Sequence, residues 1–172
     1  MNSLRWKTYP LGKRAPDFVK EVVAVFGAVW DETNSAANKL ISNDALAKLQ
    51  PGLSSIGFVV EMGKTATQKV SIPVLFGENG KVVKSFDADA FRSKDGVVIE
   101  VEAGQAVDNH RFLKDFFQAC VMQDAKHLMI AVQTSYGTKN KNDYTTIERF
   151  FDTLYASQRV GIPLESVTII GY

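Results

Sequence analysis

The alternation of apolar and polar side chains along the chain predicts four amphipathic helices. In each of them apolar residues recur three or four positions apart, so that one face of the helix is buried. Ser42 or Asn43 can cap the second helix and Asp108 or Asn109 the third, because such side chains accept hydrogen bonds from a first turn. The expected helices run from Pro16 to Trp30, from Ser42 to Gln50, from about His110 to Asp124 and from Thr145 to Ser157.

Shorter segments rich in Val, Ile and Phe predict six strands. They are residues 57–61, 68–76, 85–91, 97–102, 127–132 and 166–171. Helices that precede and alternate with strands are typical of an α/β sandwich, in which helices cover both faces of a mixed β-sheet. The chain of 172 residues is long enough for one domain spanning 1–172. Residues 1–14 mix basic and aromatic positions with Pro and Gly, which predicts a flexible arm.

Two consecutive strands, residues 85–91 and 97–102, predict a β-hairpin with an acidic face. Successive side chains of a strand point to opposite faces, so acids two residues apart lie on the same face. The opposite face carries apolar side chains that can pack inward. The acids of the hairpin are Asp87 and Asp89 on the first strand and Glu100 and Glu102 on the second.

The turn of this hairpin determines which acids face each other. Asp95-Gly96 favours a two-residue type I′ turn, because both central residues of that turn need positive φ. The resulting register pairs Lys94 with Val97, Phe91 with Glu100 and Asp89 with Glu102. Like charges opposite each other destabilise a sheet, by about 4 kcal/mol at a separation of about 4 Å and an effective dielectric constant of about 20. We therefore expect a hard divalent cation, Mg²⁺ or Mn²⁺, among the four carboxylates.

Composition and charge limit the classes of function. The net charge of +1 gives no strong overall field, so binding of DNA would need a local basic patch. The single cysteine, Cys120, lies in an apolar helical segment and is expected to be a buried thiol. The sequence shows neither a secretory signal nor an apolar segment long enough to span a bilayer. We expect a cytoplasmic protein without a membrane partner.

The acidic hairpin also resembles a known family. Phe86-Asp-Ala-Asp-Ala-Phe91 followed by Val98-Ile-Glu-Val-Glu102-Ala-Gly104 is similar to the core motif of the PD-(D/E)xK nuclease superfamily. The E-x-E in place of E-x-K resembles the BamHI/BglII-like group of type II restriction enzymes. The following helix, apolar strand and second helix fit the same order. The resemblance implies a restriction-endonuclease-like fold, with an αβββαβ mixed-sheet core flanked by helices on both faces.

The resemblance also implies roles for particular residues. Asp89, Glu100 and the carbonyl of Val101 would bind the metal ion. Glu102 stands where the lysine is usual, and it would bind a second metal ion or orient the attacking water; Asp89, Glu100 and Glu102 would then be the catalytic residues. Asp87 is an alternative to Asp89 as ligand, since both face the same way and their spacing does not separate them.

Other positions carry weaker signals. Glu61, near the end of an earlier strand, is a further candidate ligand. Basic side chains that could contact DNA phosphates are found on the third helix and in the loop after the fifth strand, although such side chains are also common on solvated surfaces. These candidates are Arg111, Lys114, Lys139 and Lys141.

Three functions are consistent with the sequence. The first is a divalent-metal-dependent DNA endonuclease, acting as a homodimer like the palindrome-cutting enzymes it resembles. The second is a non-catalytic nucleic-acid-binding or interaction protein on the same scaffold, which the missing lysine and the modest net charge favour. The third is a glycosidase whose paired carboxylates act as acid and base; the absence of an aromatic platform beside the acids ranks it last.

Overall fold

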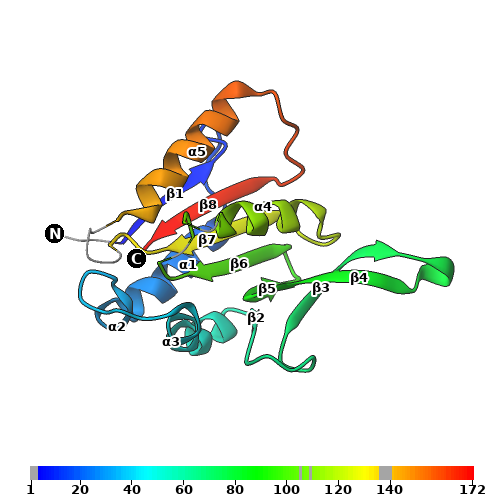
Figure 1. Ribbon diagram of the computed structural model, residues 1–172, viewed down its shortest axis with the longest axis horizontal. Coiled ribbons are helices and arrows are strands. Elements are labelled where there is room, and N and C mark those ends of the chain that lie inside the picture. Colours follow the sequence, from blue (N-terminus) through cyan, green and yellow to red (C-terminus); the bar gives the residue numbers. More distant parts are fainter. Residues whose placement is uncertain (1–3, 105, 109, 136–140) are drawn as a thin grey trace.

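A six-stranded mixed β-sheet forms the centre of the molecule in the computed structural model, which describes residues 4–104, 106–108, 110–135 and 141–172 (Figure 1). The strand order is β1-β8-β7-β6-β5-β2. The strands β6, β7 and β8 are parallel, and the other neighbours are antiparallel. The strands are β1 (Arg5–Tyr9), β2 (Val59–Val60), β5 (Ala90–Arg92), β6 (Val97–Glu102), β7 (His127–Val132) and β8 (Ser166–Gly171).

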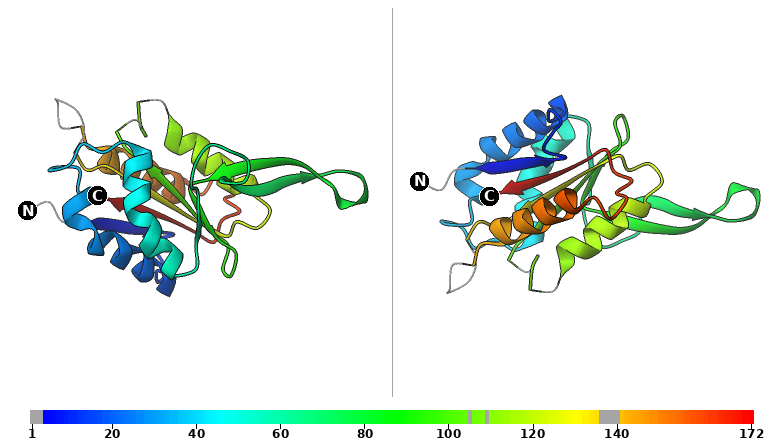
Figure 2. Two further views of the ribbon diagram at one scale, coloured as in Figure 1. Left: turned by 90° about the horizontal axis from the view of Figure 1, so that it is seen from below. Right: turned by 90° about the horizontal axis from the view of Figure 1, so that it is seen from above.

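Helices cover both faces of this sheet (Figure 2). On one face, α1 (Asp17–Ala28) and α3 (Ser42–Ser55) contribute to one apolar cluster. On the other, α4 (Arg111–Val121) and α5 (Asp143–Ser157) contribute to a second. The short α2 (Trp30–Thr33) follows α1. The expected α/β architecture with a mixed sheet between helices is confirmed.

The strand β6 shows why the sheet needs cover on both faces. Val97, Ile99 and Val101 belong to the cluster beneath α1 and α3, whereas Val98 belongs to the cluster beneath α4 and α5. Because consecutive side chains alternate between faces, a strand apolar at successive positions is stable only between two layers. Glu100 and Glu102 alternate with these residues, so their side chains project from β6 on the same face as Val98.

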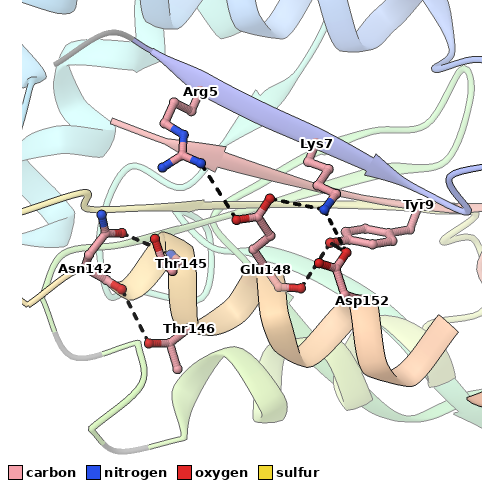
Figure 3. Close-up of polar contacts among 8 residues, drawn as sticks. All are labelled: Arg5, Lys7, Tyr9, Asn142, Thr145, Thr146, Glu148 and Asp152. Atoms are coloured by element: carbon pink, nitrogen blue, oxygen red, sulfur yellow. Dashed lines mark hydrogen bonds and ion pairs between the residues drawn. The ribbon is translucent and has the colours of Figure 1, made fainter. Parts of the chain in front are cut away.

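The first residues form an edge strand, so the predicted flexible arm is wrong for residues 5–9. β1 pairs antiparallel with β8 over its whole length. Tyr9 is fully buried, and its hydroxyl donates hydrogen bonds to Asp152 Oδ1 at 2.7 Å and to the Glu148 carbonyl at 3.1 Å (Figure 3). Lys7 Nζ lies 3.1 Å from Glu148 Oε1 and 2.8 Å from Asp152 Oδ1. These contacts attach β1 to α5.

We expect Tyr9→Phe to lower the free energy of unfolding by about 2 kcal/mol, because a buried hydrogen bond to a charged acceptor is lost. Urea denaturation followed by circular dichroism measures the change. Trp6→Phe, at an exposed position of the same strand, is the matched control and should change the midpoint little. Equal midpoints for Tyr9→Phe and the unchanged protein would contradict this account of how β1 is held.

The helix α3 continues past its predicted end at Gln50 to Ser55, with Pro51 inside it. A proline inside a helix costs about 3 kcal/mol. Leu49 and Leu53, four residues apart, are both fully buried on the same helix face, and their burial offsets that cost. The proline therefore did not mark the helix end.

A two-stranded ribbon, β3 (Val70–Phe76) and β4 (Val82–Ala88), extends away from the main sheet (Figures 1 and 2). A 3₁₀ turn, η1 (Glu78–Gly80), lies between its strands. The predicted continuous strand 85–91 is therefore divided, because β4 belongs to this ribbon and β5 to the main sheet. Asp89 lies at the division. Among the described residues, no helix is long and apolar enough to cross a membrane.

Candidate functional site

The turn between β5 and β6 differs from the predicted two-residue turn. Arg92 pairs with Val97, so the connection consists of residues 93–96. Gly96 has φ of +69° and its N–H donates to the Arg92 carbonyl at 3.0 Å. The predicted pairings of Lys94 with Val97, Phe91 with Glu100 and Asp89 with Glu102 are therefore wrong by two residues.

A buried arginine accounts for the longer turn. The Arg92 side chain is almost fully buried, and its guanidinium contacts Asp95 Oδ2 and Glu21 Oε2, each at 2.7 Å. A guanidinium in an apolar core must be paired, because its uncompensated charge would be expensive to bury. Asp95 is thus held as an ion-pair partner for Arg92 and is not a central residue of a tight turn.

The shift by two residues leaves the predicted faces unchanged, because side chains alternate with a period of two. Ala90 pairs with Ile99, and one further step along the same ladder places Asp89 beside Glu100. The N–H of Val101 donates to Asp89 Oδ2 at 2.7 Å. Asp89 and Glu100 therefore meet where the ribbon strand β4 ends and β5 begins.

Asp87 does not join these acids. Its carboxylate forms an ion pair with Lys69 and accepts a hydrogen bond from Ser71 Oγ at 2.9 Å, within the β3–β4 ribbon. The hydrogen bond from Lys69 lowers the pKa of Asp87 below its ordinary value. The bend at Asp89 separates the two aspartates, so the expected convergence of all four hairpin acids is wrong. Of the two candidate aspartates, Asp89 is the one beside Glu100.

Asp115, on α4, is an acid of the cluster that the sequence reasoning missed. It is 3% exposed, and its Oδ2 has no hydrogen-bond partner within the described part of the chain. Its Oδ1 lies 3.4 Å from Lys114 Nζ. A signal for it existed, because Asp115 shares the apolar face of its helix with Phe112 and Ala119. An acid on a buried helix face needs a partner that the chain itself has to supply or bind.

Glu61 borders the same cluster, as its sequence position suggested. Its backbone N–H donates to the Asp89 carbonyl at 2.7 Å, and its carboxylate lies 3.8 Å from Lys64 Nζ. The negative charge of Glu61 contributes to the raised pKa of Asp89. The segment after β2 thus brings another carboxylate to the point where β5 begins.

Burial raises the pKa of every central acid, and the charges of neighbouring carboxylates raise it further for Asp89, Glu100 and Glu102. Burial is the main cause in each, and it raises the pKa of Asp89 to about 6 and that of Glu102 to about 7. The pKa of Glu100 is raised well above its ordinary value, first by burial and then by the charges of Asp89 and Asp115. The pKa of Asp115 is also raised, chiefly by burial. These four side chains share one poorly solvated environment, called here the acidic cluster.

The basic side chains around the acidic cluster compensate it only in part. Arg111 Nη1 lies 3.4 Å from Glu102 Oε2, at the outer side of the cluster. Arg111 and Lys114 therefore both lie beside acids of the cluster, and both side chains stay substantially exposed. Lys141 Nζ pairs with Asp108 at 2.8 Å. The fourth predicted DNA contact, Lys139, lies outside the described residues.

The acidic cluster has the oxygen ligands of a metal site, but among the described residues these ligands do not converge on one point. Within the described ranges, no three His, Cys, Asp or Glu side chains are placed so that they could hold one metal ion. The positions of two acids explain this: Asp89 accepts from the Val101 N–H, and Glu102 is directed to Arg111. The carboxylate oxygens and the unpartnered Asp115 Oδ2 fit a hard divalent ion, provided that these side chains rotate towards it.

Two hydrogen bonds fix the end of β6 beside the acidic cluster. The hydroxyl of Tyr172, a fully buried residue after β8, donates to the Glu102 carbonyl at 3.2 Å. Ser42 Oγ, at the start of α3, accepts from the Ala103 N–H at 3.0 Å. The backbone that carries Glu102 is thereby held from two sides, while its carboxylate remains at the rim.

Comparison with protein-family models gave no match, and comparison with curated proteins gave none of significant similarity. The resemblance to the restriction enzymes therefore rests on the sequence motif alone.

Proposed function

We propose that this protein is a divalent-metal-dependent DNA endonuclease with a restriction-endonuclease-like core. One observation carries the proposal: Asp89, Glu100, Glu102 and Asp115 crowd into a single poorly solvated environment, and Asp115 Oδ2 has no hydrogen-bond partner among the described residues. A fold keeps such a cluster at a cost in stability, and a bound cation removes that cost. The topology is also consistent, since β5 and β6 are antiparallel and α4 connects β6 to the parallel β7.

Three of the four acids would hold the ion. Glu100 and Asp115 are buried, and Asp89 lies beside Glu100. A divalent ion would neutralise the phosphodiester, lower the pKa of a bound water and stabilise the leaving oxygen. The carbonyl of Val101, which the resemblance implies as a further ligand, lies between the two glutamates of the E-x-E motif.

Glu102 is suited to accept the proton of the attacking water. Glu102 stands where the E-x-K motif has a lysine, so the resemblance alone does not say which residue acts as the general base. A base works best when its pKa lies near the working pH, and burial raises the pKa of Glu102 to about 7. When the Glu102 carboxylate rotates inward, its neighbour Arg111 can donate hydrogen bonds to a phosphate oxygen.

The proposal is tested by calorimetric titration of Mn²⁺ into the protein, paired with a plasmid-nicking assay. We expect saturable Mn²⁺ binding and nicking that a chelator abolishes. The same titration on Asp115→Asn should give weaker binding, because the unpartnered oxygen becomes part of a neutral amide. Nicking that persists unchanged in excess chelator, or an absence of Mn²⁺ binding, would refute the proposal.

The second candidate is a nucleic-acid-binding protein without catalysis. The contacts of Glu102 with Arg111 and of Asp115 with Lys114 favour it, because they compensate acids without a metal ion. Salt-dependent DNA binding without cleavage in Mg²⁺ and Mn²⁺ would select this function over the first.

A further inference from the structure

A small pocket lies directly beside the acidic cluster. It has a volume of about 220 Å³ and is formed by α3 and by the segment that follows β2. Its lining residues are Asn43, Leu46, Ala47, Gln50, Glu61, Met62, Gly63 and Lys64. Glu61 connects the two places, since it lines the pocket and its backbone N–H donates a hydrogen bond to the Asp89 carbonyl. Whatever fills the pocket is therefore next to the candidate metal site.

The lining combines apolar walls with two amides. Leu46 and Met62 supply apolar surface, and Met62 is 66% exposed. Asn43 and Gln50 lie seven residues apart on α3 and thus on the same helix face. The Gln50 amide donates to Ser54 Oγ at 3.1 Å, and the Asn43 side chain makes no hydrogen bond within the described part of the chain.

This chemistry matches a nucleobase. A base has flat apolar faces and an edge of donors and acceptors, and amide side chains pair with such edges through one donor and one acceptor. Lys64, at the rim, supplies a cation for the phosphate of the same nucleotide. A pocket of about 220 Å³ is smaller than those that hold drug-sized ligands, which suits a single base.

We propose that this pocket holds one unstacked base of the DNA strand whose phosphodiester lies at the acidic cluster. The inference rests on the proposed function, and it specifies the substrate as a strand with an accessible base, either single-stranded or locally opened. A base inside a duplex cannot enter a side pocket without leaving the stack. Base preference near the cut would then arise from Asn43 and Gln50.

The test compares two strands by fluorescence anisotropy in Ca²⁺, a hard cation that carboxylates also bind. One is a short single-stranded oligonucleotide, and the other is a chain of abasic sugar-phosphate units of equal length. We expect Asn43→Leu combined with Gln50→Leu to weaken binding of the first strand about tenfold, as loss of base-edge hydrogen bonds does. Binding of the abasic strand should not change. Gln123→Leu, an exposed amide outside this pocket, is the matched control.

Each other outcome overturns the inference. Equal losses on both strands would mean that the amides act without a base, and no loss on either would mean that the pocket stays empty. Competition by a free mononucleotide as strong as that by the strand would assign the pocket to a small ligand. Failure of the nuclease proposal is seen separately, since the nicking assay can be negative while the double variant still distinguishes the two strands.

Discussion

Glu100→Gln is expected to abolish metal-dependent DNA cleavage and to leave the fold intact. Glu100 is the most central acid: it lies beside Asp89 in the sheet, and the charge of Asp115 on α4 raises its pKa. Metal ions contribute several kcal/mol to stabilising the transition state, so loss of this ligand should slow cleavage about 100-fold or more. Plasmid nicking at saturating Mg²⁺ measures the rate.

The fold of this variant should be at least as stable as that of the unchanged protein in the absence of metal. Glutamine has nearly the shape of glutamate but carries no charge to bury among other acids. Thermal unfolding in a chelator is the measurement, and the midpoint should stay equal or rise. An inactive variant with a clearly lower midpoint would show damage to the fold and would not support a catalytic role.

Asp87→Asn is the matched control for this experiment. Asp87 and Asp89 belong to the same short motif, but Asp87 is paired with Lys69 on the ribbon, away from the acidic cluster. Its replacement should leave cleavage close to that of the unchanged protein. If Asp87→Asn were inactive and Glu100→Gln active, the site would have to be rebuilt around the ribbon.

The acidic face of the hairpin could be predicted because it depends only on strand periodicity. Asp89, Glu100 and Glu102 stay on their predicted face although the register moved by two residues. The register itself depends on Arg92, whose burial between α1 and the turn is a tertiary property. No local turn preference could have anticipated that ion pair.

The remaining differences also come from contacts between distant segments. Separation of Asp87 from Asp89 requires the bend that sends β4 into the ribbon, and no glycine or proline marks that bend. Asp115 joins the cluster only when α4 packs against β6. Residues 5–9 become a strand because β8 offers an unpaired edge. The spacing of apolar residues therefore predicted most helices and strands. Which acids meet at the site is decided by the packing of distant segments, and the sequence pattern does not reveal it.

The metal-free protein is expected to lose stability as the pH rises from about 4 to about 7. The ordinary pKa of an aspartate is 3.8, and that of Asp89 in the folded protein is about 6, so between these values the folded state holds a proton that the unfolded state has released. The free energy of unfolding then falls with increasing pH. Each pH unit between the two pKa values corresponds to about 1.4 kcal/mol, which gives about 3 kcal/mol for Asp89.

Other titrating groups add to this dependence or oppose it. The raised pKa values of Glu100, Glu102 and Asp115 act in the same direction as Asp89. His127 acts oppositely, because burial lowers its pKa and its release of a proton favours the folded state as the pH rises. Asp89→Asn isolates the contribution of Asp89, since its amide oxygen can still accept from Val101.

Mg²⁺ should reverse this trend, and the reversal separates a metal site from a merely crowded acidic surface. Only the ionised carboxylates bind the ion, so stabilisation by Mg²⁺ is expected to be small near pH 5 and to grow towards pH 8. Thermal unfolding over this range, with Mg²⁺ and with chelator, measures both curves. Asp89→Asn should flatten the metal-free curve and lose most of the stabilisation by Mg²⁺. A metal-free midpoint that rises steadily from pH 5 to pH 8, together with no response to Mg²⁺, would mean that the cluster is neutralised by its own lysine and arginine neighbours. In that case the carboxylates could not serve as ligands, and catalysis at this site would have no physical basis.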